Sequence, residues 1–414
     1  MHTPAERRAL IVVENCYGPS DTRVWAEAAS LRADGWEVTV LCPAAEGANG
    51  GGETRVIDGI VLRTFALPIA TRGVQSYLRE YAVAYRRIAQ GMRTAWQEGP
   101  FAVVHFCNPP DIFFPLAVLY RLRGAAIIFD HHDLFPEVIR TRFQGWVGGV
   151  LHGLARVAEF LTYRSADIVL TTNRSGEQVA RIRGKVPPER VYVVRNGPRV
   201  DQFVPVAPVP ALKRGFRYMA CYAGVMSQQD NVLEFAEIVR DVVLRQGRTD
   251  VLFALLGDGA VRAEMKERLY EWGLAEYVHM PGMLQDKLLL RRYLCTADVC
   301  LAPEQSSPLN DRSTFIKVGE YMAMAKPIVA YDLAETRYTA GEAAVYVETG
   351  NARRYAEELV ALLDDPERRE RMGAAGRARV VRELAWEYQE RRLLAAYDTA
   401  WRRSRPARRQ AAVL

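Results

Sequence analysis

The sequence predicts an α/β protein with two parallel, doubly wound sheets, each in a Rossmann-like domain. Short apolar runs typical of buried strands alternate with segments of helical period along most of the 414 residues. A proline-rich stretch at 204–215, containing VPVAPVP, separates two such arrays. The length suits two domains that each bury a core. Ligands of such sheets bind at the carboxyl ends of the strands, so a site in a cleft between the two domains is expected.

The first domain is expected over 1–203. Its strands are expected at 10–14, 37–42, 60–65, 101–106, 125–130, 168–172 and 191–194. Its helices are expected at about 22–34, 74–96, 112–123 and 147–165, where apolar residues recur every three to four positions.

The second domain is expected over 216–383, after a linker at 204–215. Its strands are expected at 217–223, 251–256, 277–280, 298–303 and 327–330. Its helices are expected at 232–246, 261–272, 286–295, from near Thr314, at 353–364 and at 366–379, followed by a last helix from about 384.

Composition indicates a globular protein of reducing surroundings. The hydrophobic fraction is 49%, the charged fraction is 25%, and the six cysteines have no CxxC spacing. Residues 1–200 hold 24 basic and 19 acidic residues, a net +5, whereas 201–401 hold 26 and 30, a net −4. Five arginines follow at 402–409. A basic first half favours an anionic surface or substrate as partner. Nucleic acid is less favoured, because no recognition motif is present. The alternative is that these charges are solvated and bind no partner. The polar N-terminal segment MHTPAERRAL is not typical of a signal peptide.

The segment NDRSTFIKVGEYMAMA, 310–325, follows a strand-like run and reads as a loop that opens into a helix. Candidate helix caps are Asn310, Asp311, Ser313 and Thr314. Lys317 and Glu320 are three positions apart, so they share a helix face. A helix N-terminus with a lysine can bind an anion, and a glutamate one turn later can accept from vicinal hydroxyls. These features suggest a ribose-linked diphosphate, although a solvated helix face explains them too.

Two glycine turns follow strands of the second array. Gly224 ends one strand, and Gly257-Asp258-Gly259 follows the next. Glycine at such a turn allows a phosphate to approach the backbone. A routine strand-to-helix turn is an equally good explanation.

Titratable residues follow a strand of the first array in the run Phe129-Asp130-His131-His132-Asp133. Such residues at a strand end favour hydrogen bonding to substrate. His105 and Asn108 end the preceding strand and extend the same rim. Metal ligation is the weaker alternative, since adjacent residues do not easily share one ion.

The turn after the first strand, 17–23, is polar and includes Asp21 and Arg23. It has a single glycine, whereas a dinucleotide fingerprint needs three at fixed spacing, which counts against a nicotinamide dehydrogenase.

Two amphipathic helices carry apolar stripes beside arginines. One runs from Tyr77 to Trp96, and the other carries Phe143, Trp146, Val150 and Leu154. Each is compatible with lying on anionic lipid, and core packing is the commoner explanation for such a stripe.

Taken together, these segments resemble the GT-B glycosyltransferases of family 4, the retaining class that builds bacterial polysaccharides. The resemblance spans nearly the whole chain. The matching segments are 21–43, FDHHDLFPE (129–137), 164–173, VVRNGPRVDQF (193–203), YAGVMSQQD (222–230), LLGDGA (255–260), ADVCLAP (297–303), 308–332 and 362–373.

The resemblance implies two Rossmann-like domains that face a cleft and a C-terminal helix, about 384–414, that crosses back to the first domain. It also implies that Glu320 holds the ribose and that His132 lies near the donor sugar. The family's first glutamate is replaced by Arg312, and its diphosphate-gripping Arg and Lys by Val225 and Asp230. Lys317 and Arg312 are therefore our candidates for the diphosphate.

We accordingly expect His132, Lys317 and Glu320 to be catalytic. The donor-binding residues are expected to be Gly224, Gly257, Asp258, Arg312, Ser313, Thr314, Lys317 and Glu320. The acceptor side is expected to include Asp21, Arg23, His105, Asn108 and His131.

The expected activity is transfer of a sugar from a nucleoside-diphosphate sugar to a saccharide acceptor that is linked to a lipid. The expected role is assembly of a cell-surface or extracellular polysaccharide. Transfer is expected to retain the anomeric configuration and to need no metal or other cofactor. The expected location is the cytoplasm, with peripheral contact to the anionic inner face of the membrane. Two alternatives stay open: a sugar-nucleotide epimerase and a non-catalytic nucleotide-sugar-binding scaffold.

Overall fold

The computed structural model describes residues 7–45, 52–67, 73–227 and 230–411, with side chains described as far as Arg403. Met1 to Glu6, Gln228 and Gln229, and the arginine side chains beyond Arg403 therefore lie outside the described part. Contacts divide the chain into two compact units: unit 1, Met1–Val194 with Glu390–Leu414, and unit 2, Arg195–Gln389.

Unit 1 has an eight-stranded sheet with the order β3-β4-β2-β1-β5-β6-β7-β8. Its strands are β1 Arg8–Val12, β2 Glu37–Pro43, β3 Thr54–Ile57, β4 Ile60–Phe65, β5 Val103–Cys107, β6 Ala126–His131, β7 Ile168–Thr171 and β8 Val191–Val193. All neighbours pair in parallel except β3, which pairs antiparallel with β4. Strand β3 was not predicted, because most of its side chains are exposed and it carries no apolar run.

The helices of unit 1 pack on both faces of this sheet. They are α1 Thr22–Ala33, α2 Val74–Gln97, α3 Phe114–Leu122, α4 Phe135–Arg142, α5 Gly145–Ser165, α6 Arg174–Ile182 and the later part of α14 Trp386–Ala411. Residues of α2, α3 and α5 share a buried apolar cluster with the strands. Tyr397 of α14 contacts His105 of β5 and Trp36 at ring centroid distances of 5.8 and 5.3 Å. The last helix therefore packs on unit 1, as expected.

Unit 2 has a six-stranded parallel sheet with the order β11-β10-β9-β12-β13-β14. The strands are β9 Tyr218–Ala223, β10 Val251–Leu256, β11 Val278–Gly282, β12 Val299–Ala302, β13 Ile328–Tyr331 and β14 Ala344–Val347. The helices are α7 Glu234–Arg240, which continues as a π-helix through Arg245, α8 Arg262–Glu271, α9 Lys287–Thr296, α10 Ile316–Ala323, α11 Ala334–Ala340, α12 Ala352–Asp364 and α13 Pro366–Arg379.

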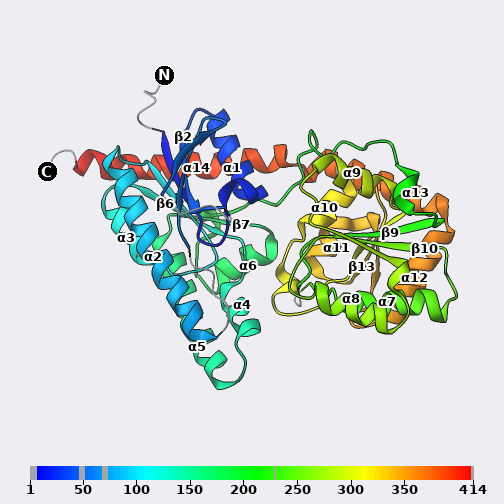
Figure 1. Ribbon diagram of the computed structural model, residues 1–414. Helices are drawn as coiled ribbons and strands as arrows, with labels where there is room; N and C mark the ends of the chain where they lie inside the picture. The colour runs from blue at the N-terminus through cyan, green and yellow to red at the C-terminus, as the bar shows by residue number, and fades with distance from the viewer. Residues whose placement is uncertain (1–6, 46–51, 68–72, 228–229, 412–414) are drawn as a thin grey trace. The chain divides into compact units, whose positions relative to one another are not determined.

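Alternating side chains of β9 separate the two cores of unit 2. Ala220 and Tyr222 pack toward α7, α8 and α12, whereas Met219 and Cys221 pack toward α9 and α10. Figure 1 shows these two groups of helices on opposite faces of the sheet. This burial on both faces explains why the strands read as continuous apolar runs.

The division between the units falls after Val194, nine residues before the boundary expected at 203. Arg195 lies in unit 2, within 3.4 Å of the Glu335 carboxylate. The segment expected as a linker also lies on unit 2: the Val209 amide donates to the Thr296 hydroxyl at 2.9 Å, and Pro210–Lys213 forms a 3-10 turn.

Candidate functional site

In unit 2, the predicted residues gather where the strand order of the sheet reverses. β9 pairs with β10 on one side and with β12 on the other, so the helices after β9 and β12 leave toward opposite faces. Gly224 follows β9, Gly257 follows β10, and α10 is the helix after β12. The carboxyl ends at such a reversal form the usual ligand crevice of an open parallel sheet.

Lys317 of α10 is 8% exposed, and its ammonium is held by three groups. Its Nζ donates to Glu304 Oε1 at 2.5 Å and to the Tyr222 hydroxyl at 3.0 Å, and it lies 3.7 Å from Asp230 Oδ1. Burial acts to lower the pKa of Lys317, but the neighbouring Glu304, Tyr222 and Asp230 more than reverse this and raise the pKa above its ordinary value. The lysine is therefore a fixed cation at the end of β9.

Glu304, two residues beyond β12, is the acidic partner of this lysine. It is 1% exposed, and burial raises its carboxyl pKa although Lys317 opposes the shift. We did not predict Glu304 or Tyr222 from the sequence. The available signal was an acid directly after a buried strand, in ADVCLAPE.

At both predicted glycine positions, neighbouring atoms lie too close to leave room for a side chain. A Cβ built on Gly224 would lie 2.9 Å from Lys317 Cε and Nζ, and one built on Gly257, whose φ is +152°, would lie 1.9 Å from the Gly224 carbonyl oxygen. The structure thus brings Gly224, Gly257 and Lys317 together. We expected a phosphate to approach the backbone at Gly224, but the side chain of Lys317 occupies the space beside that glycine.

Glu320 lies three residues beyond Lys317 on α10 and is partly exposed. Among the described residues, none makes a hydrogen bond to its carboxylate. Burial raises the pKa of Glu320 to about 7, and the charges of Lys317 and Lys287 limit that rise. A carboxylate with open acceptor sites beside a fixed cation can receive hydroxyl groups of a ligand.

The loop before α10 differs from the expectation. Helix α10 begins at Ile316, and its N-cap is Phe315, which makes no side-chain cap bond. The prediction that Asn310, Asp311, Ser313 or Thr314 caps this helix was wrong. Residues Asn310–Arg312 form a separate 3-10 turn instead.

Side chains of this loop are used within it. Asn310 Nδ2 donates to the Gln305 carbonyl, Asp311 accepts from the Ser306 hydroxyl at 3.0 Å, and Ser313 Oγ donates to the Leu309 carbonyl. The exposed Arg312 donates to the Pro308 carbonyl at 2.8 Å. Thr314 is partly buried directly before Phe315. The exposed Asp258, after Gly257, lies 3.5 Å from Arg262 Nη1.

In unit 1, His132 stands at the carboxyl end of β6 with its ring partly exposed. Its Nε2 lies 2.6 Å from Asp130 Oδ2, and its backbone amide donates to Asn108 Oδ1 at 2.6 Å. Asp130 in turn accepts from Arg23 Nε at 3.0 Å and Nη2 at 2.8 Å. Burial would raise the Asp130 pKa, but Arg23 and then His132 depress it well below its usual value.

This chain from Arg23 through Asp130 to His132 is hidden from solvent except at the imidazole. It fixes the orientation of the imidazole that the sequence singled out. Neither Asp130 nor Glu27, whose Oε1 lies 3.1 Å from Arg23 Nη2, was among the predicted site residues. Asp130 is 107 positions from Arg23 in sequence, so only the fold reveals that pairing, whereas Glu27 is four positions from Arg23 on α1.

Four of the five residues expected on the acceptor side are enclosed. Arg23, His105, Asn108 and His131 are 4, 0, 1 and 3% exposed. These four side chains are not open to solvent, and their place on the acceptor side stays a prediction. The fifth, Asp21, is partly exposed and caps α1 by accepting from the amides of Arg23 and Val24.

The two enclosed imidazoles bond to tyrosines. His105 Nδ1 lies 2.8 Å from the Tyr397 hydroxyl, and His131 Nδ1 lies 3.0 Å from the Tyr163 hydroxyl. Burial lowers the pKa of His131 to about 4, so this imidazole is neutral at physiological pH.

His105, Cys107 and Asp130 are close enough to share a metal ion. However, both oxygens of Asp130 accept from the Arg23 guanidinium, and burial raises the pKa of the Cys107 thiol. A dication would therefore lie beside the fixed positive charge of Arg23. These residues do not fit a metal.

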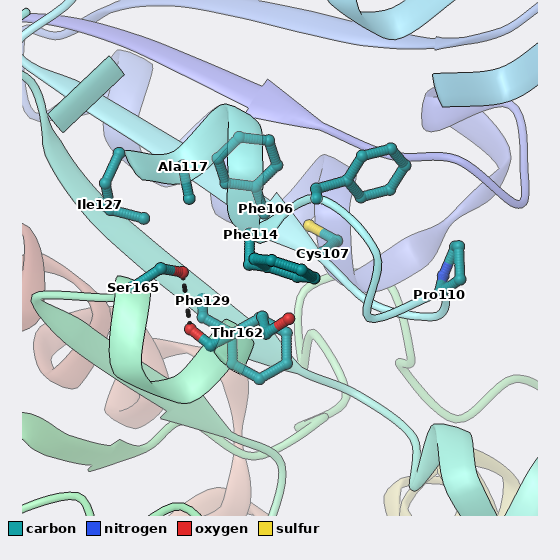
Figure 2. Close-up of a pocket in the computed structure, with 10 residues that line it drawn as sticks. Phe106, Cys107, Pro110, Phe114, Ala117, Ile127, Phe129, Thr162 and Ser165 are labelled. Atoms are coloured by element: carbon teal, nitrogen blue, oxygen red, sulfur yellow. Dashed lines mark hydrogen bonds between the residues drawn. The ribbon is translucent and has the colours of Figure 1, made fainter. Parts of the chain in front are cut away.

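Figure 2 shows residues that line a small apolar cavity in unit 1, between the sheet and helices α3 and α5. The volume of this cavity is about 10 Å³. Its walls include Phe106, Cys107, Phe114 and Phe129, and Ser165 donates a hydrogen bond to the Thr162 carbonyl beside it. A volume near that of a single water-sized probe is a packing void. None of the predicted site residues lines it.

Comparison with known proteins follows the same two-unit division. The family model for the glycosyl transferase 4-like domain matches residues 20–197, and the model for glycosyl transferases group 1 matches residues 217–365. Phosphatidyl-myo-inositol mannosyltransferase of Mycobacterium leprae is 25% identical over 375 residues, 89% of this chain and 90% of that protein. Alpha-maltose-1-phosphate synthase of Mycobacterium tuberculosis is 26% identical over 305 residues, 66% and 74% of the two chains.

Solved structures share the fold at low sequence identity. Sucrose-phosphate synthase from Thermosynechococcus elongatus superimposes with a TM-score of 0.73 and 16% identity, covering 99% of this chain and 100% of that one. Anabaena Alr3699/HepE in complex with UDP-glucose gives a TM-score of 0.67 and 14% identity, covering 95% and 99%. The protein is a glycosyltransferase with the GT-B fold. This favours a transferase over the epimerase and the non-catalytic scaffold.

Proposed function

We propose that the enzyme transfers a sugar from a nucleoside-diphosphate sugar to a saccharide, with the donor bound at the carboxyl edge of the unit 2 sheet. The observation that carries this proposal is the Glu320 carboxylate. It has no hydrogen-bond partner among the described residues, and it lies one helical turn from the buried cation Lys317. Anabaena Alr3699/HepE, which shares the fold, has been solved with UDP and with UDP-glucose, which supports a donor of this class.

In this proposal the ribose hydroxyls donate to Glu320, and the diphosphate lies toward Lys317 and the first amides of α10. Lys317 then shares its ammonium between Glu304 and a phosphate oxygen. Charge-assisted hydrogen bonds from a fixed cation and from helix amides favour a dianionic group. Glu304 keeps Lys317 charged and oriented when no donor is bound.

The reaction passes through an oxocarbenium-like state as the nucleoside diphosphate leaves. The protein's contribution is to stabilise the negative charge that develops on the leaving group, which requires donors arranged in advance. We propose that Lys317 and the α10 amides do this without a metal. We further propose retention of configuration through attack on the same face as the departing group. His132, oriented by Asp130, is our candidate for contact with the donor sugar.

The proposed acceptor is a lipid-linked saccharide of cell-surface or extracellular polysaccharide assembly, reached at the cytoplasmic face of the membrane. A relative that matches most of the chain is named for transfer to phosphatidyl-myo-inositol, a lipid. The described residues contain no helix with the length and apolar character that crossing a bilayer would need.

A thermal-shift screen against nucleoside diphosphates and their sugar conjugates tests the donor class. Calorimetry on wild type and Glu320→Gln then tests the site. We expect one nucleotide family to stabilise wild type and the variant to lose most of that affinity. Equal binding of the nucleotide by both proteins would remove Glu320 from the donor site. Incubating the enzyme and the donor with lipid extracts tests transfer by mass spectrometry of the products, and NMR of the purified product tests retention at the anomeric carbon.

A further inference from the structure

Helix α5 presents an unusual apolar face to solvent. Trp146 is 81% exposed, and Val150, Leu154 and Val157 are 54, 62 and 57% exposed. With Leu161, these residues recur at intervals of three or four, so they line one side of the helix. The other exposed positions between Gly145 and Leu161 are Gly149, Gly153 and Phe160. A helix of 21 residues is about 31 Å long, so an uncharged strip covers most of its length.

The other amphipathic helix found in the sequence, α2, behaves differently. Its Ile88 and Met92 are fully buried, and Trp96 packs on Tyr120 at a centroid distance of 5.0 Å. Core packing therefore accounts for the stripe of α2. It does not account for α5, whose buried side carries a separate set of residues that includes Ala155, Thr162 and Tyr163.

Helix α3 carries exposed apolar residues as well. It packs against α5 and exposes Val118, Leu119 and Leu122, the last at 80%. We call the exposed apolar residues of α3 and α5 the apolar face. Contiguous exposed apolar surface of this kind marks an interaction site, whereas single exposed apolar residues are ordinary.

The exposed charges around the apolar face are mostly positive. On α3, α4 and α5 and at their ends, the exposed ionisable residues are the arginines Arg121, Arg123, Arg140, Arg142 and Arg164 and one acid, Asp133, before α4, while Arg156 is partly exposed. The acids of these helices, Glu137 and Glu159, are buried and lie beside Arg183. Arg140 reaches the strip itself, since a Cβ built on Gly149 would lie 3.7 Å from its Nη1.

We propose that unit 1 docks on an anionic lipid bilayer through the apolar face, with α5 lying in the interfacial plane. An apolar strip beside arginines is what an interfacial helix requires, because the strip enters the acyl boundary while the guanidinium groups meet lipid phosphates. Trp146, at the exposed start of the helix, is suited to the headgroup level. A second copy of this chain is a poorer occupant, because a two-fold interface would set the same arginines against each other.

Vesicle binding tests this proposal. Purified full-length protein is sedimented with vesicles of phosphatidylcholine alone or of phosphatidylcholine mixed with phosphatidylglycerol. We expect binding to the mixed vesicles that weakens with salt, as exposed charge pairs do. The double variant Val150→Asp with Leu154→Asp should lose at least about tenfold in partitioning, because it places two carboxylates in the strip. Ile182→Asp, at a position 75% exposed on α6, is the matched control and should bind as wild type does.

Tryptophan fluorescence supplies a second readout. The difference between wild type and Trp146→Phe isolates one indole, which brominated lipids should quench if it enters the acyl boundary. Equal sedimentation of the double Asp variant and wild type, or the absence of binding to mixed vesicles at every salt concentration, would overturn the proposal. So would a wild-type dimer that the same variant converts to monomer in analytical ultracentrifugation without any lipid binding.

These outcomes are separable from the proposed donor site. Calorimetry with a water-soluble nucleotide involves no lipid, so the double Asp variant should bind the nucleotide as wild type does. Loss of vesicle binding with intact nucleotide binding therefore concerns the apolar face alone.

Discussion

Donor binding should depend on pH through Glu320. Its pKa of about 7 means that about 9% of the carboxyl group is ionised at pH 6 and about 91% at pH 8. If the ribose hydroxyls donate to the carboxylate, protonation removes acceptor capacity and affinity follows the ionised fraction. We therefore expect binding to be about tenfold weaker at pH 6 than at pH 8, with a midpoint near 7. The direction follows because donor binding favours the deprotonated form, and the raised pKa of Glu320 places the change between pH 6 and pH 8.

Isothermal titration calorimetry with the nucleotide sugar chosen by the thermal-shift screen measures this effect. A nucleotide sugar is preferable to a free diphosphate, because both of its phosphates are esterified and do not titrate in this range. At pH 6, binding should release close to one proton, seen by comparing buffers of different ionisation enthalpy. Glu320→Gln is the matched control and should flatten the profile. Lys287→Gln should move the midpoint upward, because Lys287 lowers the pKa of Glu320.

Two results would contradict the role proposed for Glu320. A wild-type profile as flat as that of Glu320→Gln would mean that the carboxyl group takes no part in binding. Binding that strengthens as the pH falls would mean that the protonated form is preferred, and the assignment of Glu320 as an acceptor for the ribose would fail.

Three further predictions follow from buried contacts. Glu304→Gln should tighten binding of a nucleoside diphosphate by about tenfold or more relative to binding of the nucleoside. The reason is that one negative charge about 6 Å from a phosphate opposes binding by up to about 2.8 kcal/mol at an effective dielectric of about 20. Calorimetry with both ligands measures the ratio of the two affinities, and an unchanged ratio would show that Lys317 is only a structural partner of Glu304. Asp130→Asn should lower the free energy of unfolding by about 3 kcal/mol, because the buried Arg23 guanidinium loses the carboxylate that accepts two of its hydrogen bonds and keeps only Glu27 beside it, as denaturant titration measures. Gly257→Ala should cost about 2–4 kcal/mol, because the new methyl group meets a backbone oxygen at 1.9 Å and the residue holds a positive φ.

Controls distinguish these effects from general damage. Asp258→Asn removes an exposed carboxylate near the same edge and should leave stability within about 0.5 kcal/mol. Gly350 has a positive φ of 78°, and nothing lies within 4 Å of a Cβ built on it. Gly350→Ala therefore measures the cost of the backbone conformation without the steric clash that Gly257→Ala adds. A loss for Gly257→Ala no larger than that for Gly350→Ala would contradict the close-approach account. Full stability of Asp130→Asn would contradict the charge account of the Arg23 pair.

Most strands and long helices were predictable, because their apolar residues repeat with the period of the element. Strand Ile60–Phe65 and strand Val251–Leu256 were placed at their observed bounds. The missed strands β3 and β14 are short, and most of their side chains are not buried. Helix α10 begins two residues later than expected, since the polar residues before it bond within their own 3-10 turn and do not cap it.

The residues of the candidate site were also predictable where the signal is local and missed where it depends on distant partners. Glycines at strand ends and the spacing of Lys317 and Glu320 are local features, and both drew attention in the sequence. The hydrogen-bond partners of Lys317 and Arg23 were not identified from the sequence, because Glu304 is 13 positions from Lys317 and Asp130 is 107 positions from Arg23. The same limit applied to the acceptor rim, where histidine and asparagine at strand ends predicted exposure that the packing of Tyr397 and Tyr163 removes.

The sequence alone determined the α/β class, the two arrays and the helix carrying Lys317 and Glu320, because hydrophobic period and turn chemistry act over a few residues. Which charges are paired and which apolar stripes are covered depends on the packing of distant segments. Helices α2 and α5 have similar patterns, yet Met92 is fully buried and Trp146 is 81% exposed. A periodic stripe shows that a helix has an apolar face, but what covers that face depends on chain segments far away in the sequence.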